Sequence, residues 1–212
     1  MCIISDRISP QIIPGRSEVE SRTVADVLIH LVRHALAENH GVDPGLSATG
    51  ITQASALGRR ISANPPTAII HSGLRRAEQT ARILGSATGV SPVRSEVADD
   101  LTPIPVAVDV SSYPKRLLPW FETIPTNERD PGGEKIGRAL VSLVQLAAEA
   151  DSAGILVVTH AFVIGAMVQR ALGLASHQWL EFQSDNTGLT SIRRRPDGSL
   201  TLVRFNDTSH LN

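Results

Sequence analysis

Residues 28–34 read LIHLVRH and residues 155–160 read ILVVTH, and these two stretches decide the fold class. Each is a short apolar run that suits a buried strand, and each leads into a segment with helical character. Ligands of an open α/β sheet bind just beyond the carboxyl ends of its strands. Because the runs end on His34 and His160, and Arg33 precedes the first histidine, we expect one shared site for an anion.

The spacing of apolar residues predicts further elements of an α/β domain between and after these two strands. Ser47 and Ser72 are the expected N-caps of the first two helices, and Gly173 is expected to end the fourth. A turn at residues 196–198 predicts a hairpin near the end of the chain. The expected helices cover residues 48–61, 73–84, 134–149 and 162–172, and the expected strands cover residues 27–32, 68–71, 155–159, 189–192 and 199–205.

The chain is long enough for one domain, which we place at residues 26–206. Residues 1–25 show little periodicity and are expected to form a mobile N-terminal extension, and residues 207–212 to form a tail. Residues 99–131 are rich in proline and also lack periodicity. Such a segment is typical of a lid or substrate loop, and a disordered insertion is the alternative.

Composition limits the classes of partner and the compartment. Hydrophobic residues make up 42% of the 212 residues, and the net charge of −1 gives no reason to expect nucleic acid or an anionic membrane as a partner. Cys2 is the only cysteine, which excludes an intrachain disulfide and a cysteine-based zinc site. No signal-like start and no apolar run of membrane-spanning length are present, so the cytoplasm is the expected location, and a homodimer stays open.

The expected strand ends also supply groups that suit phosphate. Arg33 follows one strand, His71 ends another, and Arg76 lies one turn into the helix after it. Guanidinium groups match phosphate oxygens in a bidentate fork, and helix N-termini add backbone N–H groups and a positive dipole. The pattern therefore predicts a phosphate pocket that has neither a P-loop nor an apparent metal cage.

Four ordered blocks of the chain resemble the motifs of the histidine phosphatase superfamily, also called phosphoglycerate mutase-like. Asn186 and Thr187, before the late strand, fit the same pattern. Alanine stands at positions 35 and 161, where the family usually has glycine. The four blocks are LVRHA at 31–35, LSATGITQA at 46–54, SGLRRAEQTA at 72–81 and VVTHA at 157–161.

The resemblance implies a three-layer α/β/α sandwich around a mostly parallel, mixed sheet. It also implies that His34 is the nucleophile and carries a transient phosphohistidine. Arg33, Arg76 and His160 would bind the phosphoryl oxygens, with His160 protonated as it faces the dianion. No cofactor is implied.

The proton donor for the leaving group is less clear in the sequence. The family's Leu-x-Glu context is matched here by ADDLTP at 98–103, which puts proline where the glutamate would fall. Asp100 is the first candidate for a general acid and Asp99 the second, and some relatives that act on good leaving groups use no obvious donor. Glu134 is expected to be a cap or an indirect contributor.

Other polar residues near the motifs have weaker roles. Asn39, in the loop after the first histidine, is a candidate contact for substrate phosphate, and His71 is a candidate for lining the site. Arg75 is expected to be solvated, and Ser72 to cap a helix instead of acting as a nucleophile.

The leading functional hypothesis is a metal-independent phosphatase that hydrolyses a small phosphomonoester or a phosphorylated side chain, the latter with a phosphoprotein as partner. Phosphoglycerate mutase-type transfer is the first alternative, disfavoured by the missing Leu-x-Glu context. A catalytically weak protein that binds a phosphorylated ligand is the second. A metallohydrolase is less favoured because no ligand spacing accompanies His34 and His160.

Overall fold

The computed structural model describes residues 27–39, 41–150 and 153–212. The predicted extension at residues 1–25 lies outside the described residues, as does His40.

The centre of the protein is a six-stranded sheet in the order β3-β2-β6-β1-β7-β8. The first four of these strands are mutually parallel, and β7 and β8 add an antiparallel hairpin to the β1 edge, so the predicted mixed sheet is confirmed. All five residues of β6 are buried, which explains why the first four form an aliphatic run. The strands are β1 (Val27–Arg33), β2 (Ala68–His71), β3 (Pro92–Arg94), β6 (Ile155–Thr159), β7 (Leu189–Arg194) and β8 (Leu200–Asp207).

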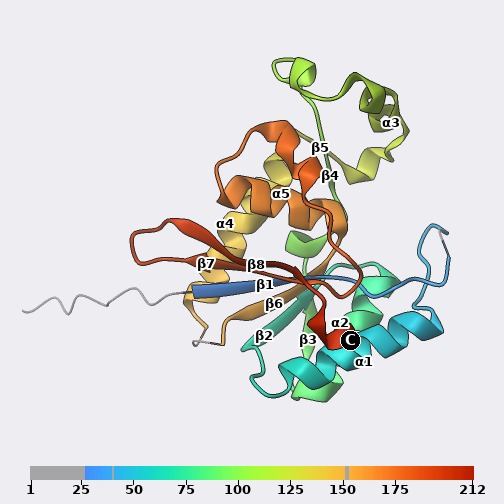
Figure 1. The fold of residues 1–212 in the computed structure, drawn as a ribbon, viewed down its shortest axis with the longest axis vertical. Helices are drawn as coiled ribbons and strands as arrows, with labels where there is room; N and C mark the ends of the chain where they lie inside the picture. Colours follow the sequence, from blue (N-terminus) through green and yellow to red (C-terminus); the bar gives the residue numbers. More distant parts are fainter. Residues whose placement is uncertain (1–26, 40, 151–152) are drawn as a thin grey trace, which may run out of the picture.

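Two pairs of helices cover the two faces of this sheet and complete the predicted three layers (Figure 1). Helices α1 (Ala48–Ile61) and α2 (Arg75–Thr88) pack on one face, where Leu57 and Leu84 are fully buried. Helices α4 (Glu134–Ala148) and α5 (Ala161–Ala171) pack on the other face with the larger part of the core. Among the described residues no helix is both long and apolar enough to cross a membrane.

One of the two predicted helix caps is correct. The Ser47 side chain accepts a hydrogen bond from the Gly50 N–H at 3.0 Å, as an N-cap does. The Ser72 cap is wrong, because Leu74 has extended backbone and α2 begins only at Arg75, without a side-chain cap. The Ser72 hydroxyl is instead hydrogen-bonded to His160, which makes it part of the site described below.

Residues 99–131 contain more structure than their lack of periodicity predicted. Strands β4 (Thr102–Ile104) and β5 (Arg129–Pro131) pair in parallel at the two ends of the segment, and the short helix α3 (Leu118–Thr123) lies between them. Trp120 in α3 packs edge-on against Phe162 of α5, with ring centroids 5.5 Å apart. These elements are too short to show a period, and aromatic packing holds them against the domain.

The end of the chain also packs on the domain. Strand β8 includes Asp207, the first residue of the predicted tail, and Arg60 of α1 forms an ion pair with it. A 3-10 turn at Ser209–Leu211 then lies beside α1.

Candidate active site

The sheet register brings the two motif histidines together. Strands β1 and β6 are parallel neighbours with Arg33 opposite Thr159, so the next residue of each chain segment, His34 and His160, leaves the same edge of the sheet. The centroids of the two imidazole rings lie 5.1 Å apart. The backbone N–H of His34 donates to the backbone carbonyl of Thr159 at 3.0 Å. Two residues 126 positions apart therefore share one site.

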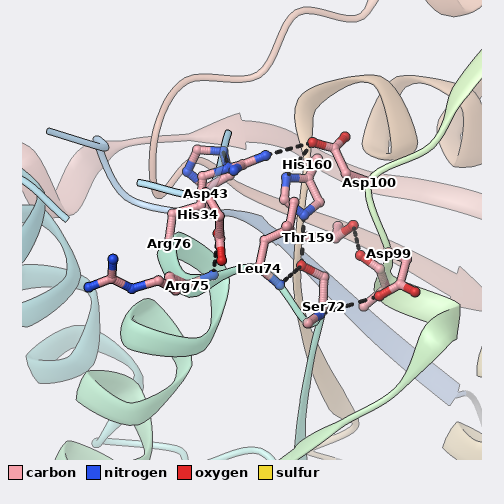
Figure 2. Close-up of polar contacts among 12 residues, drawn as sticks. His34, Asp43, Ser72, Leu74, Arg75, Arg76, Asp99, Asp100, Thr159 and His160 are labelled. Carbon is pink, nitrogen blue, oxygen red and sulfur yellow. Dashed lines mark hydrogen bonds and ion pairs between the residues drawn. The ribbon is translucent and has the colours of Figure 1, made fainter. Parts of the chain in front are cut away.

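Arg76 reaches this site from the first turn of α2 and joins its two sides (Figure 2). Its Nε donates to His34 Nε2 at 3.2 Å, and its Nη2 donates to Asp100 Oδ2 at 2.7 Å. Thr80, one turn further along α2, donates to the Arg76 carbonyl at 2.7 Å and accepts from the Ala35 N–H at 3.0 Å. The start of α2 is thus fixed to the segment that carries the first histidine.

Two hydrogen bonds define the tautomer of His34. Nε2 accepts from Arg76, which can only donate, so the proton must lie on Nδ1, which bonds to the Ala35 carbonyl at 2.8 Å. Burial lowers the pKa of His34 to about 3, with further contributions from His160 and the two nearby guanidiniums. At neutral pH the ring is therefore neutral, with the Nε2 lone pair directed toward Arg76.

His160 is held from one nitrogen and free at the other. Its Nε2 is hydrogen-bonded to Ser72 Oγ at 2.8 Å. Its Nδ1 is buried without a hydrogen bond among the described residues, although Asp100 Oδ2 is 3.2 Å away. Burial, followed by the charges of Arg76 and Arg33, holds the pKa of His160 well below its usual value. His160 is therefore neutral in the free site, and its protonation when it faces a phosphate dianion stays a prediction.

The structure distinguishes the two candidate acids. We call the cluster of Arg33, His34, Arg76 and His160 the cradle. Asp100 joins the cradle through its ion pair with Arg76. Asp99 instead accepts from the Gly73 N–H at 3.3 Å and lies 3.6 Å from Arg94. Burial raises the pKa of Asp100, although Arg76, His34 and Arg33 act in the opposite direction. The Asp100 carboxylate forms an ion pair with Arg76, which is one of the two arginines, with Arg33, that would bind a phosphoryl group.

Arg33 completes the cationic side of the cradle. Its Nη1 donates to the Ser184 carbonyl at 2.6 Å, which orients the guanidinium. Its Nε is buried and has no hydrogen-bond partner in the described part of the chain. A buried polar group of this kind that lacks a partner is a candidate for a hydrogen bond to a bound ligand.

Two predicted site residues do not join this cluster. Asn39 is exposed, and its Oδ1 accepts from the Gly41 N–H at 2.8 Å. His71 is buried, and its Nδ1 bonds to the adjacent Ser72 carbonyl at 2.8 Å. Within the described ranges, neither side chain forms a hydrogen bond or ion pair with the two histidines or Asp100.

The structure also shows the surroundings of Arg75 and Glu134, two charged residues near the motifs. Arg75 is exposed and points away from the cluster in Figure 2. Glu134 is exposed at the start of α4, and its nearest cation is Arg138, at 3.8 Å. The carboxylate that caps α4 is Asp130, whose two oxygens accept from the N–H groups of residues 135 and 136, each at 2.9 Å.

A cavity of about 700 Å³ adjoins Asp100 on the side of α4. Glu128 is among its lining residues, and burial together with Asp100 raises the pKa of Glu128. Nothing in the sequence indicated Glu128, because only the folding of residues 99–131 brings it beside the site. The cavity is also lined by five other charged side chains, namely Arg94, Glu96, Asp99, Lys135 and Arg138.

Metal ligation has no geometric support in the described ranges. No group of three or more His, Cys, Asp or Glu side chains there could hold a metal ion. The donors around His34 are instead guanidiniums, an imidazole and one carboxylate, which suit a phosphoryl group.

A family model covers most of this domain, including both histidines of the site. The family model described as histidine phosphatase superfamily (branch 1) matches residues 29–208, so the chain belongs to this superfamily. Its members include phosphatases and mutases.

Two curated relatives represent these two activities. The chain is 28% identical over 192 residues to the mitochondrial serine/threonine-protein phosphatase PGAM5 of Mus musculus, covering 86% of this chain and 63% of the relative, so it spans under two thirds of that protein's length. It is 27% identical over 194 residues to a probable phosphoglycerate mutase, GpmB, of Yersinia pestis, covering 80% and 85% of the two chains.

Solved structures share the fold. A mycobacterial glucosyl-3-phosphoglycerate phosphatase matches with a TM-score of 0.66 and 22% identity, covering 86% of this chain and 99% of that one. A phosphoserine phosphatase mutant from Entamoeba histolytica, in complex with phosphoserine, matches with a TM-score of 0.68 and 24% identity, covering 87% and 99%.

Proposed function

We propose that this protein is a metal-independent phosphatase that hydrolyses a small phosphomonoester or a phosphorylated side chain through a phosphohistidine at His34. The observation that carries the proposal is the neutral His34 ring, protonated on Nδ1, whose Nε2 lies 3.2 Å from the Arg76 guanidinium. In-line attack on phosphorus requires an unprotonated nitrogen beside a phosphate-binding cation, and its lone pair becomes free once the phosphate takes the Arg76 N–H.

In the first step Nε2 of His34 attacks phosphorus, and the bond between phosphorus and the ester oxygen breaks. Arg33, Arg76 and His160 stabilise the charge on the three equatorial oxygens. Asp100, in its protonated form, gives a proton to the departing alkoxide. Water then attacks the phosphohistidine with Asp100 as base, which releases inorganic phosphate and restores the His34 lone pair.

The leaving group would lie in the cavity beside Asp100. The volume of this cavity, about 700 Å³, is in the range of small-molecule sites. Asp99 faces Arg94 in this cavity, while Lys135 and Arg138 of α4 are available to an anionic group of the substrate. Glu96 and Glu128 would suit a cationic group. The lining therefore favours an alcohol that carries charge over a bare alkyl or aryl group.

Hydrolysis of p-nitrophenyl phosphate by single variants tests the proposal. H34A should lose turnover, and R76M should lose most of it, whereas R75M should retain it because Arg75 points away from the cluster. Arginines at consecutive positions thus provide a matched pair. Unchanged turnover in H34A, or inhibition of the wild type by a chelator, would reject the mechanism.

Mutase-type transfer is the alternative that the relationship to the GpmB proteins favours. A mutase must keep its phosphohistidine until substrates exchange, whereas a phosphatase passes the group to water. Trapping phosphorylated His34 and adding either water alone or an excess of acceptor alcohol would separate the two activities. A protein that only binds phosphorylated ligands would form no phosphohistidine at all.

A further inference from the structure

The backbone of the nucleophile is held by a turn that lies far away in the sequence. The Asn186 side chain donates to the His34 carbonyl at 2.8 Å, and the Thr187 N–H donates to the Arg33 carbonyl at 3.0 Å. Both carbonyls of the Arg-His pair thus depend on residues 185–188, the loop before β7. The position of the His34 ring relative to Arg76 therefore depends on this loop.

This loop contains a backbone conformation that a threonine rarely adopts. Thr187 has φ of 59°, in the left-handed region that disfavours β-branched residues. Strain of this kind persists only where surrounding contacts impose it, and it is concentrated at functional sites. Here the strained residue is the one whose N–H reaches Arg33.

A residue at the end of the chain contacts this strained threonine. The Thr187 hydroxyl donates to the Asn186 carbonyl at 2.6 Å, so its lone pairs remain for His210 Nε2, 2.9 Å away. His210 must therefore donate through Nε2–H. Burial and the charge of Arg60 lower the pKa of His210, and Asp207 acts against them.

Independent contacts fix the C-terminal turn in place. Arg60 of α1 donates to Asp207 Oδ1 at 3.0 Å and also bonds to its second carboxylate oxygen. Asn206 accepts from the Asp185 N–H and donates to the Asp185 carboxylate, at 2.8 Å and 2.7 Å. The segment that carries His210 is thus anchored on α1 and on the same loop.

We propose that His210 is a positioning residue for catalysis: its Nε2–H holds Thr187 in its strained conformation, and the loop in turn holds the backbone of His34 against Arg76. The proposal rests on His34 being the nucleophile of the proposed phosphatase. His210 makes no contact with the cradle in the described residues, so its effect must pass through Thr187 and Asn186.

Two substitutions at this position separate a positioning role from a merely structural one. In H210Q the amide nitrogen can replace Nε2 as donor, whereas the shorter H210N cannot reach the hydroxyl. We expect kcat of H210N for p-nitrophenyl phosphate to fall about tenfold with KM changed less than about twofold, since a small misplacement of a nucleophile lowers turnover. H210Q should retain kcat within about threefold, as should L211A, a control on the same turn.

Hydrogen exchange of the Thr187 amide tests the role of His210 in the loop without a measurement of catalytic activity. The Thr187 N–H, bonded to the Arg33 carbonyl, should exchange at least about tenfold faster in H210N than in the wild type and H210Q. Full activity in H210N, or an equal loss in both variants, would overturn the proposal. An inactive wild type would instead reject the phosphatase, and the Thr187 exchange rate alone would then decide whether His210 holds the loop.

Discussion

Replacing Asp100 with asparagine should tighten the binding of inorganic phosphate and slow catalysis at the same time. The Asp100 carboxylate lies 2.7 Å from Nη2 of Arg76 and 3.2 Å from Nδ1 of His160, two groups that a phosphoryl oxygen would use. A phosphate must therefore compete with Asp100 for Arg76. In D100N the competitor is neutral and isosteric.

The size of the effect follows from the environment of the pair. The Arg76 and Asp100 side chains are only 14% and 21% exposed, so water screens their attraction incompletely. A hydrogen bond between charged groups of this kind contributes about 1.5–3 kcal/mol, and asparagine would keep part of it. A gain of about 1.4 kcal/mol for phosphate corresponds to an inhibition constant about tenfold lower.

Catalysis should change in the opposite direction, and the change should depend on the leaving group. Loss of the proton donor should lower kcat/KM for an alkyl phosphate by about 10²- to 10⁴-fold. p-Nitrophenolate departs without a proton, so kcat/KM for p-nitrophenyl phosphate should fall less than about threefold or rise. Competitive inhibition by phosphate and kcat/KM for both esters measure these quantities. Weaker phosphate inhibition in D100N, or equal losses for both esters, would refute the assignment of Asp100.

Three further predictions concern the same site. The pKa of His34 is lowered to about 3 on folding, so the unfolded chain takes up a proton first as the pH falls below about 6.5. The free energy of unfolding that this neutral ring contributes is complete at neutral pH and should decline by about 2 kcal/mol between pH 6.5 and 4.5. Urea unfolding should show a smaller decline in H34Q, and parallel pH dependences would contradict the buried neutral ring. In S72A the buried Nε2 of His160 loses its partner, so stability should fall by about 1–3 kcal/mol and kcat by about tenfold, while S86A on the exposed side of α2 should change neither in thermal melts and assays. K135M should raise KM about fivefold for O-phosphoserine and leave it unchanged for phosphoethanolamine, which lacks the carboxylate, and an equal change for both would remove Lys135 from the leaving-group site.

The parts of the fold that sequence could predict are those whose chemistry is local. The first four residues of β6 are aliphatic because that strand is covered on both faces, so its composition directly reflects its place in the sheet. Ser47 was predictable as a cap because a cap requires only the following turn. The shared location of His34 and His160 follows from one rule about the ends of parallel strands.

The parts that could not be predicted depend on contacts between distant segments. Ser72 stands at a position where a helix cap would be reasonable, and only the closeness of β2 to β6 gives its hydroxyl a better partner in His160. Glu128 and His210 have no local signal at all, because each acts through a residue brought to it by folding. The position of Asn39 in the loop after His34 predicts a phosphate contact, but the side chain is exposed to solvent.

In the proposed mechanism Asp100 would have two roles, and the charges of the free site account for both. Two partly buried guanidiniums would repel each other and disfavour the compact site, and Asp100 offsets part of that cost while both histidines stay neutral. A phosphate dianion supplies the same compensation with more negative charge, so it can displace Asp100 from Arg76 and favour a proton on His160. Once displaced, Asp100 loses the cation that opposes its protonation while it remains at the wall of the leaving-group cavity. In the proposed mechanism, substrate binding itself would thus favour the protonated Asp100 that the first chemical step needs.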